Sequence, residues 1–285
     1  MLKDIQFSAA DGVALKGYVI EAQTPKAVVL INPGTATKTH FYRPFAEYLA
    51  ENGYHVMLWN YRGFCISRTQ SLANSDIEYS HIGEFDIPAA IKKAKTLYPD
   101  LPLLCVGHST GGQQIGLAEN CNELAGLVAV AVSTGYYGGM PAGYRRQAKL
   151  FFKVIAPISN GLFGYVKAKK LNLMEDLPPK LAREWGQWCA KPDFMFDEKF
   201  KQQKPQIANY RTFEFPVQVL TADDDEISTA VNTERLWRHI KSTKPIEFTY
   251  YKAAEMPKKA VGHFGYFRRA NQQVWVDILR HLSSF

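Results

Sequence analysis

The chain has 285 residues and a formal net charge of +7; 46% of its residues are hydrophobic and 21% are charged, which is typical of a globular protein large enough to bury a full core. It contains no run of about 18 apolar residues, and its first residues lack the apolar core of a signal peptide, so we expect a cytoplasmic protein without a membrane span. The four cysteines are scattered and form no CxxC pair, which argues against a disulfide framework and against a zinc site.

The first half of the chain alternates between strand-like and helix-like patterns. Residues 5–20 predict an antiparallel hairpin, because two alternating runs flank the turn sequence ADG. Short, continuous apolar runs predict strands that are buried on both faces, at residues 26–32, 54–59, 101–107 and 124–133. Helical patterns separate these strands, at residues 41–52, 82–97 and 111–121.

The same alternation resumes near the C-terminal end. Strand-like runs at residues 216–222 and 245–251 alternate with helical patterns near 229–240 and 268–282. Strands that alternate with helices predict an α/β fold, with a mostly parallel sheet of about eight strands and helices on both faces. We therefore predict one core, which is formed by residues 1–134 and 213–285.

Residues 135–212 interrupt the alternation and are predicted to form a helical cap inserted into the core. Residues 135–211 carry 14 Lys or Arg against 6 Asp or Glu, whereas the remainder has 20 against 21. This charge indicates either a solvated helical surface or a surface that attracts anionic substrates or lipid headgroups, and we expect no nucleic-acid partner because no binding motif accompanies it. The sequence TGYYGGMPAGY at residues 134–144 is a candidate hinge.

The sequence GHSTGG at residues 107–112 matches the pattern G-x-S-x-G, with Ser109 at its centre. It follows a predicted buried strand and opens a predicted helix, which is the setting of a nucleophile elbow. There the flanking glycines tolerate a sharp turn, and the serine oxygen projects beyond the carboxyl end of the sheet, where ligands of open α/β sheets bind. The main alternative, a phosphate-binding turn, would need a glycine in place of Ser109 or a following Lys.

A serine nucleophile requires a base, and three histidines follow the predicted cap. His239 and His281 fall within predicted helices. His263 lies in a glycine-flanked loop after the last predicted strand, where catalytic residues gather. We therefore expect His263 to be the base.

The base needs an acid that orients it, and the oxyanion needs two hydrogen-bond donors. Four consecutive acidic residues follow the strand at 216–222, and chemistry alone does not choose among them; some are expected to cap the next helix. The donors are expected to be the backbone N–H groups of Thr110, which follows the nucleophile, and of Thr35, in the loop after the strand at 26–32.

These segments resemble those of the α/β-hydrolase superfamily, and the likeness covers nearly the whole chain. GHSTGG is similar to the GHSxGG elbow, VLTADDDEI to a V-L-x-G-x-x-D pattern that selects Asp225 as the acid, and VGHFGYF to the segment that carries the base. WNYRGFCIS resembles a D-x-R-G-x-G-x-S stretch, with Asn60 and Cys65 as departures, and Pro33 stands where a histidine is common. A looser likeness connects the chain with bacterial hydrolases of unassigned substrate.

The resemblance implies acyl transfer to water by Ser109, His263 and Asp225, with Thr110 and Thr35 in the oxyanion hole and with no metal or organic cofactor. The implied substrate is a small-molecule carboxylic ester or thioester, and the aromatic content of the cap favours a lipid-like or aromatic acyl group. An acyltransferase or peptidase with the same triad and a non-catalytic small-molecule-binding protein are the alternatives. The sequence leaves the oligomeric state open.

Overall fold

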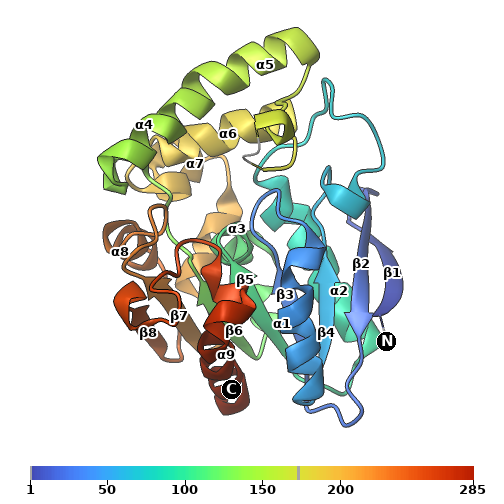
Figure 1. Cartoon of the computed structure of the whole chain (residues 1–285). Helices are drawn as coiled ribbons and strands as arrows, with labels where there is room; N and C mark the ends of the chain where they lie inside the picture. Colours follow the sequence, from blue (N-terminus) through green and yellow to red (C-terminus); the bar gives the residue numbers. More distant parts are fainter. Residues whose placement is uncertain (1, 172–173) are drawn as a thin grey trace.

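The computed structural model describes residues 2–171 and 174–285 and has an eight-stranded sheet at its centre (Figure 1). The strand order is β1-β2-β4-β3-β5-β6-β7-β8. The strands are β1 (Leu2–Ser8), β2 (Ala14–Ile20), β3 (Ala27–Asn32), β4 (Tyr54–Trp59), β5 (Leu103–His108), β6 (Gly126–Val130), β7 (Val217–Ala222) and β8 (Ile246–Tyr251).

Strands β3 to β8 pair in parallel, whereas β1 and β2 form an antiparallel hairpin at one edge of the sheet. Every residue of β3, β4, β5, β6 and β7 is buried, because helices cover both faces there. The prediction of an α/β-hydrolase fold with a mostly parallel sheet of about eight strands is confirmed.

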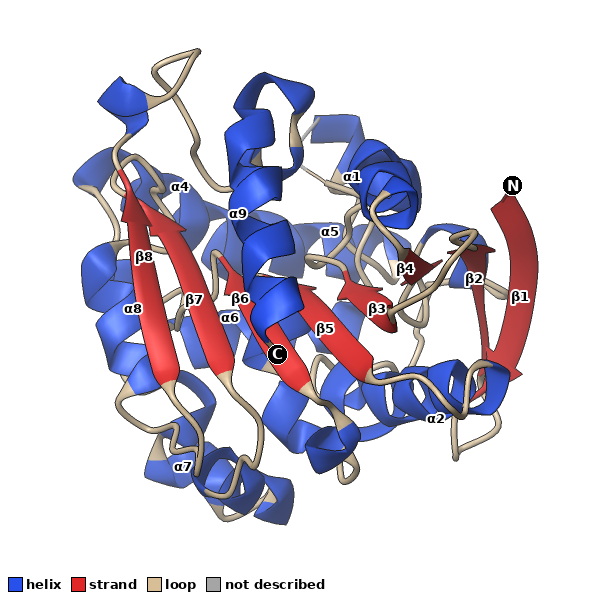
Figure 2. Cartoon of the chain, turned by 90° about the horizontal axis from the view of Figure 1, so that it is seen from below, coloured by secondary structure: helices blue, strands red, loops and turns tan. Residues whose placement is uncertain are grey.

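Helices pack on both faces of the sheet (Figure 2). On one face, α1 (Thr39–Glu51) and α9 (Gln272–Ser284) share a hydrophobic core with the strands. On the other face, α2 (Ile87–Leu97), which continues a π turn at Ile82–Asp86, shares a second core with α8 (Ala230–Trp237). The loops at the carboxyl ends of the parallel strands therefore extend from a sheet that is packed on both faces.

The helix after the elbow is shorter than predicted. We expected residues 111–121 to be helical, but α3 (Thr110–Gln113) is a single turn, and a separate 3-10 turn follows at Ile115–Leu117. The Tyr210 hydroxyl, 97 positions along the chain, donates a hydrogen bond to the Gln113 carbonyl, which a longer helix would use internally. The prediction was wrong because this distant contact, which a local pattern does not reveal, replaces the helical hydrogen bond.

Residues 135–212, which we call the insert, lie between β6 and β7; helices α4, α5 and α6 of the insert lie over the carboxyl ends of the parallel strands (Figure 1), and its last residues return to the amino end of β7. The insert comprises α4 (Ala142–Leu150), a π turn (Phe151–Ile155), α5 (Ala156–Phe163), α6 (Pro179–Cys189) and α7 (Glu198–Lys201). Within the described residues, no helix is both long enough and apolar enough to cross a membrane.

Candidate active site

Ser109 lies at the sharp turn between β5 and α3. Its φ of 50° and ψ of −116° are unusual for a residue with a side chain and indicate local strain. A Cβ atom at Gly107 or Gly111 would lie 2.7 or 2.2 Å, respectively, from the nearest backbone atom, so the turn requires glycine on both sides. The Ser109 amide donates a hydrogen bond of 2.9 Å to the Val130 carbonyl, which anchors the turn to β6.

Two backbone N–H groups beside this turn are available for a ligand. Among the described residues, neither the N–H of Thr35 nor that of Thr110 has an acceptor. The hydroxyl groups of Thr35 and Thr110 are hydrogen-bonded to each other, which holds the loop after β3 against the start of α3. We call Thr35 and Thr110, with the hydrogen bond between them, the wall of the site. The Tyr79 hydroxyl lies 2.6 Å from Thr110 Oγ1 and 3.0 Å from Gln113 Oε1, so it supports this wall.

The insert reaches this wall through Tyr79. The Trp185 ring of α6 is stacked on the Tyr79 ring, with centroids 5.4 Å apart, and Trp188 meets it edge-on at 5.2 Å. Burial raises the pKa of Tyr79, so its hydroxyl stays neutral and able to donate. Helix α6 is therefore joined to the Thr35 and Thr110 wall by one aromatic side chain.

His263 lies in the loop after β8, and its Nδ1 is 2.9 Å from Asp225 Oδ2 and 3.1 Å from Asp225 Oδ1. The Asp225 side chain is fully buried and also accepts hydrogen bonds from the amides of Ile227 (2.9 Å) and Ser228 (2.8 Å). Burial alone would raise the pKa of Asp225, but His263 and these two amides together hold it below its usual value. The group is therefore a carboxylate that fixes the orientation of the imidazole.

The other aspartates of the acidic run hold neighbouring loops. Asp224 accepts hydrogen bonds from the amides of Val261 and Gly262, each at 2.8 Å, directly before His263. Asp223 accepts one from the Ala253 amide at 2.8 Å. Helix α8 is capped by the hydroxyl of Thr229, so the expectation that some of these acids cap it was wrong.

His108 precedes Ser109, but both nitrogens of its imidazole already have hydrogen-bond partners, so it is not placed to act as the base. It is buried, and its two nitrogens lie 2.6 Å from the Tyr42 hydroxyl and 2.8 Å from the His263 carbonyl oxygen. The Tyr42 oxygen in turn accepts a 2.9 Å hydrogen bond from the Gly34 amide. Burial and the neighbouring His263 lower the pKa of His108 to about 3, so it stays neutral.

Tyr42, Tyr79 and His108 therefore support the site, and the sequence analysis assigned none of them a role. Their partners are 66, 31 and 155 positions away, so a local pattern treats them as packing residues. In the described part of the chain, no hydrogen bond joins the Ser109 hydroxyl to the His263 imidazole. Such contacts are often long in unliganded enzymes and tighten when substrate binds.

Residues 23–181 match the family described as "Serine aminopeptidase, S33". The chain belongs to this family of α/β hydrolases. The matched range holds Ser109 and both threonines of the wall but ends before Asp225 and His263, so their pairing rests on the geometry given above. No curated protein sequence matches the chain significantly.

Solved structures of hydrolases have the same fold. A soluble variant of monoglyceride lipase from Saccharomyces cerevisiae is 15% identical, with a TM-score of 0.72 over 100% of this chain and 96% of that one. An esterase from Pyrococcus furiosus is 17% identical, with a TM-score of 0.64 over 100% and 91% of the two chains. A carboxyl esterase from Bacillus coagulans is 13% identical, with a TM-score of 0.61 over 99% and 98%.

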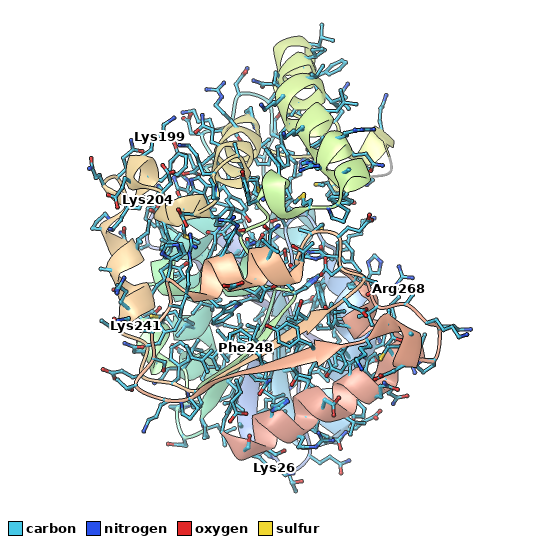
Figure 3. The ribbon with its side chains drawn as sticks, turned by 90° about the vertical axis from the view of Figure 1, so that its left-hand side faces the viewer. Lys26, Lys199, Lys204, Lys241, Phe248 and Arg268 are labelled. Atoms are coloured by element: carbon cyan, nitrogen blue, oxygen red, sulfur yellow. The ribbon has the colours of Figure 1, made fainter. Side chains whose placement is uncertain are left out.

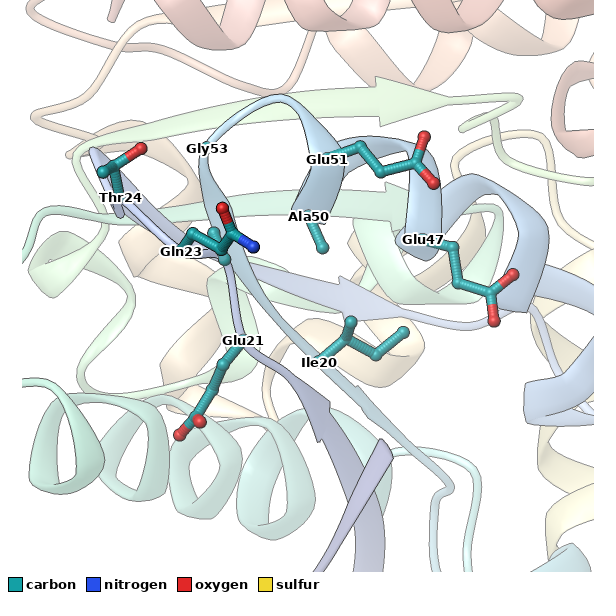
Figure 4. A pocket seen from close by; sticks show the side chains of 9 residues that line it. Ile20, Glu21, Gln23, Thr24, Glu47, Ala50, Glu51 and Gly53 are labelled. Atoms are coloured by element: carbon teal, nitrogen blue, oxygen red, sulfur yellow. The ribbon is translucent and has the colours of Figure 1, made fainter. Parts of the chain in front are cut away.

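This α/β hydrolase also has a hollow of about 450 Å³ between the ends of β2 and α1 (Figure 4). Strand β4 begins there, so the hollow lies at the opposite end of the sheet from Ser109. Two of the glutamates that line it already have partners, since Glu21 pairs with Lys3 and Glu47 with Arg43. We therefore assign the hollow no part in the chemistry.

Proposed function

We propose that the chain is a serine hydrolase that cleaves a carboxylic ester or thioester through Ser109, His263 and Asp225. One observation carries the proposal. The buried Asp225 carboxylate lies 2.9 Å from His263 Nδ1, and this pair and the strained Ser109 turn are both at the carboxyl ends of the parallel strands. A base oriented by a buried acid and a serine at a nucleophile elbow are the parts of a catalytic triad. Membership of a hydrolase family supports the same conclusion.

The first step in this mechanism is attack on the acyl carbonyl. Because His263 Nδ1–H donates to Asp225, the other ring nitrogen is free to accept the Ser109 proton. As the serine oxygen bonds to the carbonyl carbon, the N–H groups of Thr35 and Thr110 bind the oxyanion. One such donor is worth about 3 kcal/mol toward the transition state.

The second step releases the leaving group and then the acid. His263 gives its proton to the departing alcohol or thiol, which leaves an acyl group on Ser109. Water then loses a proton to His263 and attacks the ester, and the serine oxygen leaves with that proton. Asp225 remains ionised throughout and stabilises the transient imidazolium.

We further propose a lipid-like acyl substrate. The support is the insert, whose Trp185 and Trp188 lie against Tyr79 on the wall of the site. The similar yeast enzyme is a monoglyceride lipase, and the Bacillus coagulans esterase was solved with glycerol. Rates on a series of p-nitrophenyl esters test this: activity should rise with acyl length, and activity confined to short chains would contradict it.

Peptide hydrolysis is the second candidate, because the family is described as a serine aminopeptidase. The same three residues would then attack an amide, whose leaving amine needs protonation by His263. Matched ester, thioester and amino-terminal amide substrates with one acyl group separate the candidates. We expect hydrolysis of the ester and thioester; turnover of the amide alone would favour the peptidase.

The decisive experiment is labelling with a fluorophosphonate probe. The wild type and a Ser284→Ala control, which changes an exposed serine, should be labelled, whereas Ser109→Ala should not. If Ser109→Ala is labelled equally, the assignment of the nucleophile is wrong. If the wild type is unlabelled but binds ligands as Ser109→Ala does, the chain is a binding protein.

A further inference from the structure

The outermost element of the insert carries a continuous row of exposed apolar side chains. Helix α4, the π turn and α5 form one helical rod, which stands out from the molecule as the green helix of Figure 3. Along it, Leu150, Val154, Ile158 and Leu162 are 52%, 44%, 57% and 71% exposed. Single exposed apolar residues are ordinary, but a contiguous row of four marks a contact surface.

The four residues recur at every fourth position. In a regular helix of 3.6 residues per turn, that spacing drifts around the axis, and the wider π turn at Phe151–Ile155 counters the drift. The opposite side of the rod is packed: Phe151 is buried, and Phe152 meets the Trp185 ring edge-on at 5.0 Å. The rod is thus already anchored to α6, and its exposed row has no packing role.

Basic side chains flank this row, and acidic ones are absent from the sequence around it. Residues 124–174 contain seven Lys or Arg and no Asp or Glu. Arg146, Lys149 and Lys153 are exposed beside the apolar row, and none of the three forms an ion pair with another described residue. We call the four apolar and these three basic residues the outer face.

We propose that the outer face docks on the surface of an anionic lipid bilayer. An amphipathic helix with basic residues beside an apolar row lies in the membrane interface, where the apolar side chains enter the acyl region and the cations meet phosphate groups. A second copy of the chain fits less well, because a symmetric contact would place like charges against each other.

A groove beside the outer face agrees with a lipid partner. It has a volume of about 420 Å³, lies between α5 and α6, and shares Lys153, Pro157 and Gly161 with the exposed side of the rod. Arg183 lines the groove from α6, and Tyr137 and Phe152 contribute apolar surface. An acyl chain near the interface would find apolar contacts there, with two cations for a headgroup.

Vesicle co-sedimentation of the full chain tests the proposal. At roughly 0.15 M salt the wild type should bind phosphatidylcholine vesicles that contain about 30 mol% phosphatidylglycerol, and should bind pure phosphatidylcholine far less. Each cation near an anionic surface contributes about fivefold to partitioning, so Lys149→Glu/Lys153→Glu should lower the partition coefficient at least about 20-fold. Ile158→Gln/Leu162→Gln should lower it roughly tenfold or more.

Matched controls lie elsewhere on the surface. Lys241→Glu/Lys244→Glu makes the same charge change, and Phe248→Gln removes an exposed apolar side chain of β8, away from the rod (Figure 3). Both should bind like the wild type. Ser109→Ala should also bind normally, because docking does not depend on the chemistry at that residue.

Two results would overturn the proposal. One is equal binding by the outer-face variants and the controls. The other is a wild type that does not bind anionic vesicles but forms a dimer, detected by analytical ultracentrifugation, which the Ile158→Gln/Leu162→Gln substitutions dissociate. The outer face would then be a contact between copies of the chain. Circular dichroism melting of every variant establishes that all are folded, which is expected because the changed side chains are exposed.

Discussion

The His108 imidazole is hydrogen-bonded to the backbone carbonyl of His263 across 2.8 Å. Because a carbonyl only accepts, His108 Nε2 carries the proton, and Nδ1 accepts from the Tyr42 hydroxyl. The Tyr42 oxygen accepts from the Gly34 amide, so this buried chain is fully satisfied with a neutral His108. It connects the loop of the candidate base to the loop that carries Thr35.

Tyr42→Phe should therefore destabilise the fold. The substitution leaves the Gly34 amide and His108 Nδ1 buried without partners, which costs about 1–3 kcal/mol. Urea denaturation measures the loss in the free energy of unfolding. Tyr48→Phe is the matched control on the same helix, since the Tyr48 hydroxyl has no partner among the described residues. An equal loss of stability in both variants would show that the hydrogen bonds of Tyr42 are not responsible.

Asp224→Ala should lower kcat strongly while changing the free energy of unfolding only a little. It removes the acceptor for the Val261 and Gly262 amides, which hold the chain immediately before His263, and a displacement of about 1 Å can cost on the order of 100-fold in rate. The control is Asp223→Ala, which frees only the Ala253 amide. Steady-state kinetics should show a lower kcat with little change in KM, and equal rates for the two variants would remove this positioning role.

The central strands of this fold are predictable because their environment is uniform. Residues of β3, β4, β5 and β7 are buried on both faces, so each strand appears in the sequence as a short, mostly apolar run. The structure of the residues after Ser109 was harder to predict, because the helix there ends where the distant Tyr210 hydroxyl binds the Gln113 carbonyl. Local patterns predict an element well only where distant contacts agree with them.

The candidate site divides in the same way. Ser109 and His263 stand out because glycines and strand ends surround them. The acidic run gave four equivalent candidates from chemistry alone, and the resemblance selected Asp225, which is the one in contact with His263. The role of Tyr79 could not be predicted from the sequence, because only folding brings its hydroxyl to Thr110.

Stability should depend on pH through Asp225. Its folded-state pKa lies below the unfolded value of about 3.9, so the ionised carboxylate stabilises the native state above that pH. The contribution is lost as the pH falls through the folded-state pKa. The difference in unfolding free energy between the wild type and Asp225→Asn should therefore shrink below about pH 4; a difference that stays constant there contradicts the assignment.

Lys204→Met should loosen the insert from the core. Lys204, labelled in Figure 3, lies 3.2 Å from Glu84, 3.6 Å from Glu184 and 2.7 Å from the Ser80 hydroxyl, and its side chain is only 12% exposed. Removing one partner from a largely buried ion pair leaves uncompensated charge, which costs about 3 kcal/mol. Thermal denaturation should show a lower Tm, whereas Lys201→Met, which removes an exposed pair, should change it little. Because Glu184 belongs to α6, which carries Trp185, the variant should also turn over substrate more slowly; an unchanged Tm would exclude this attachment.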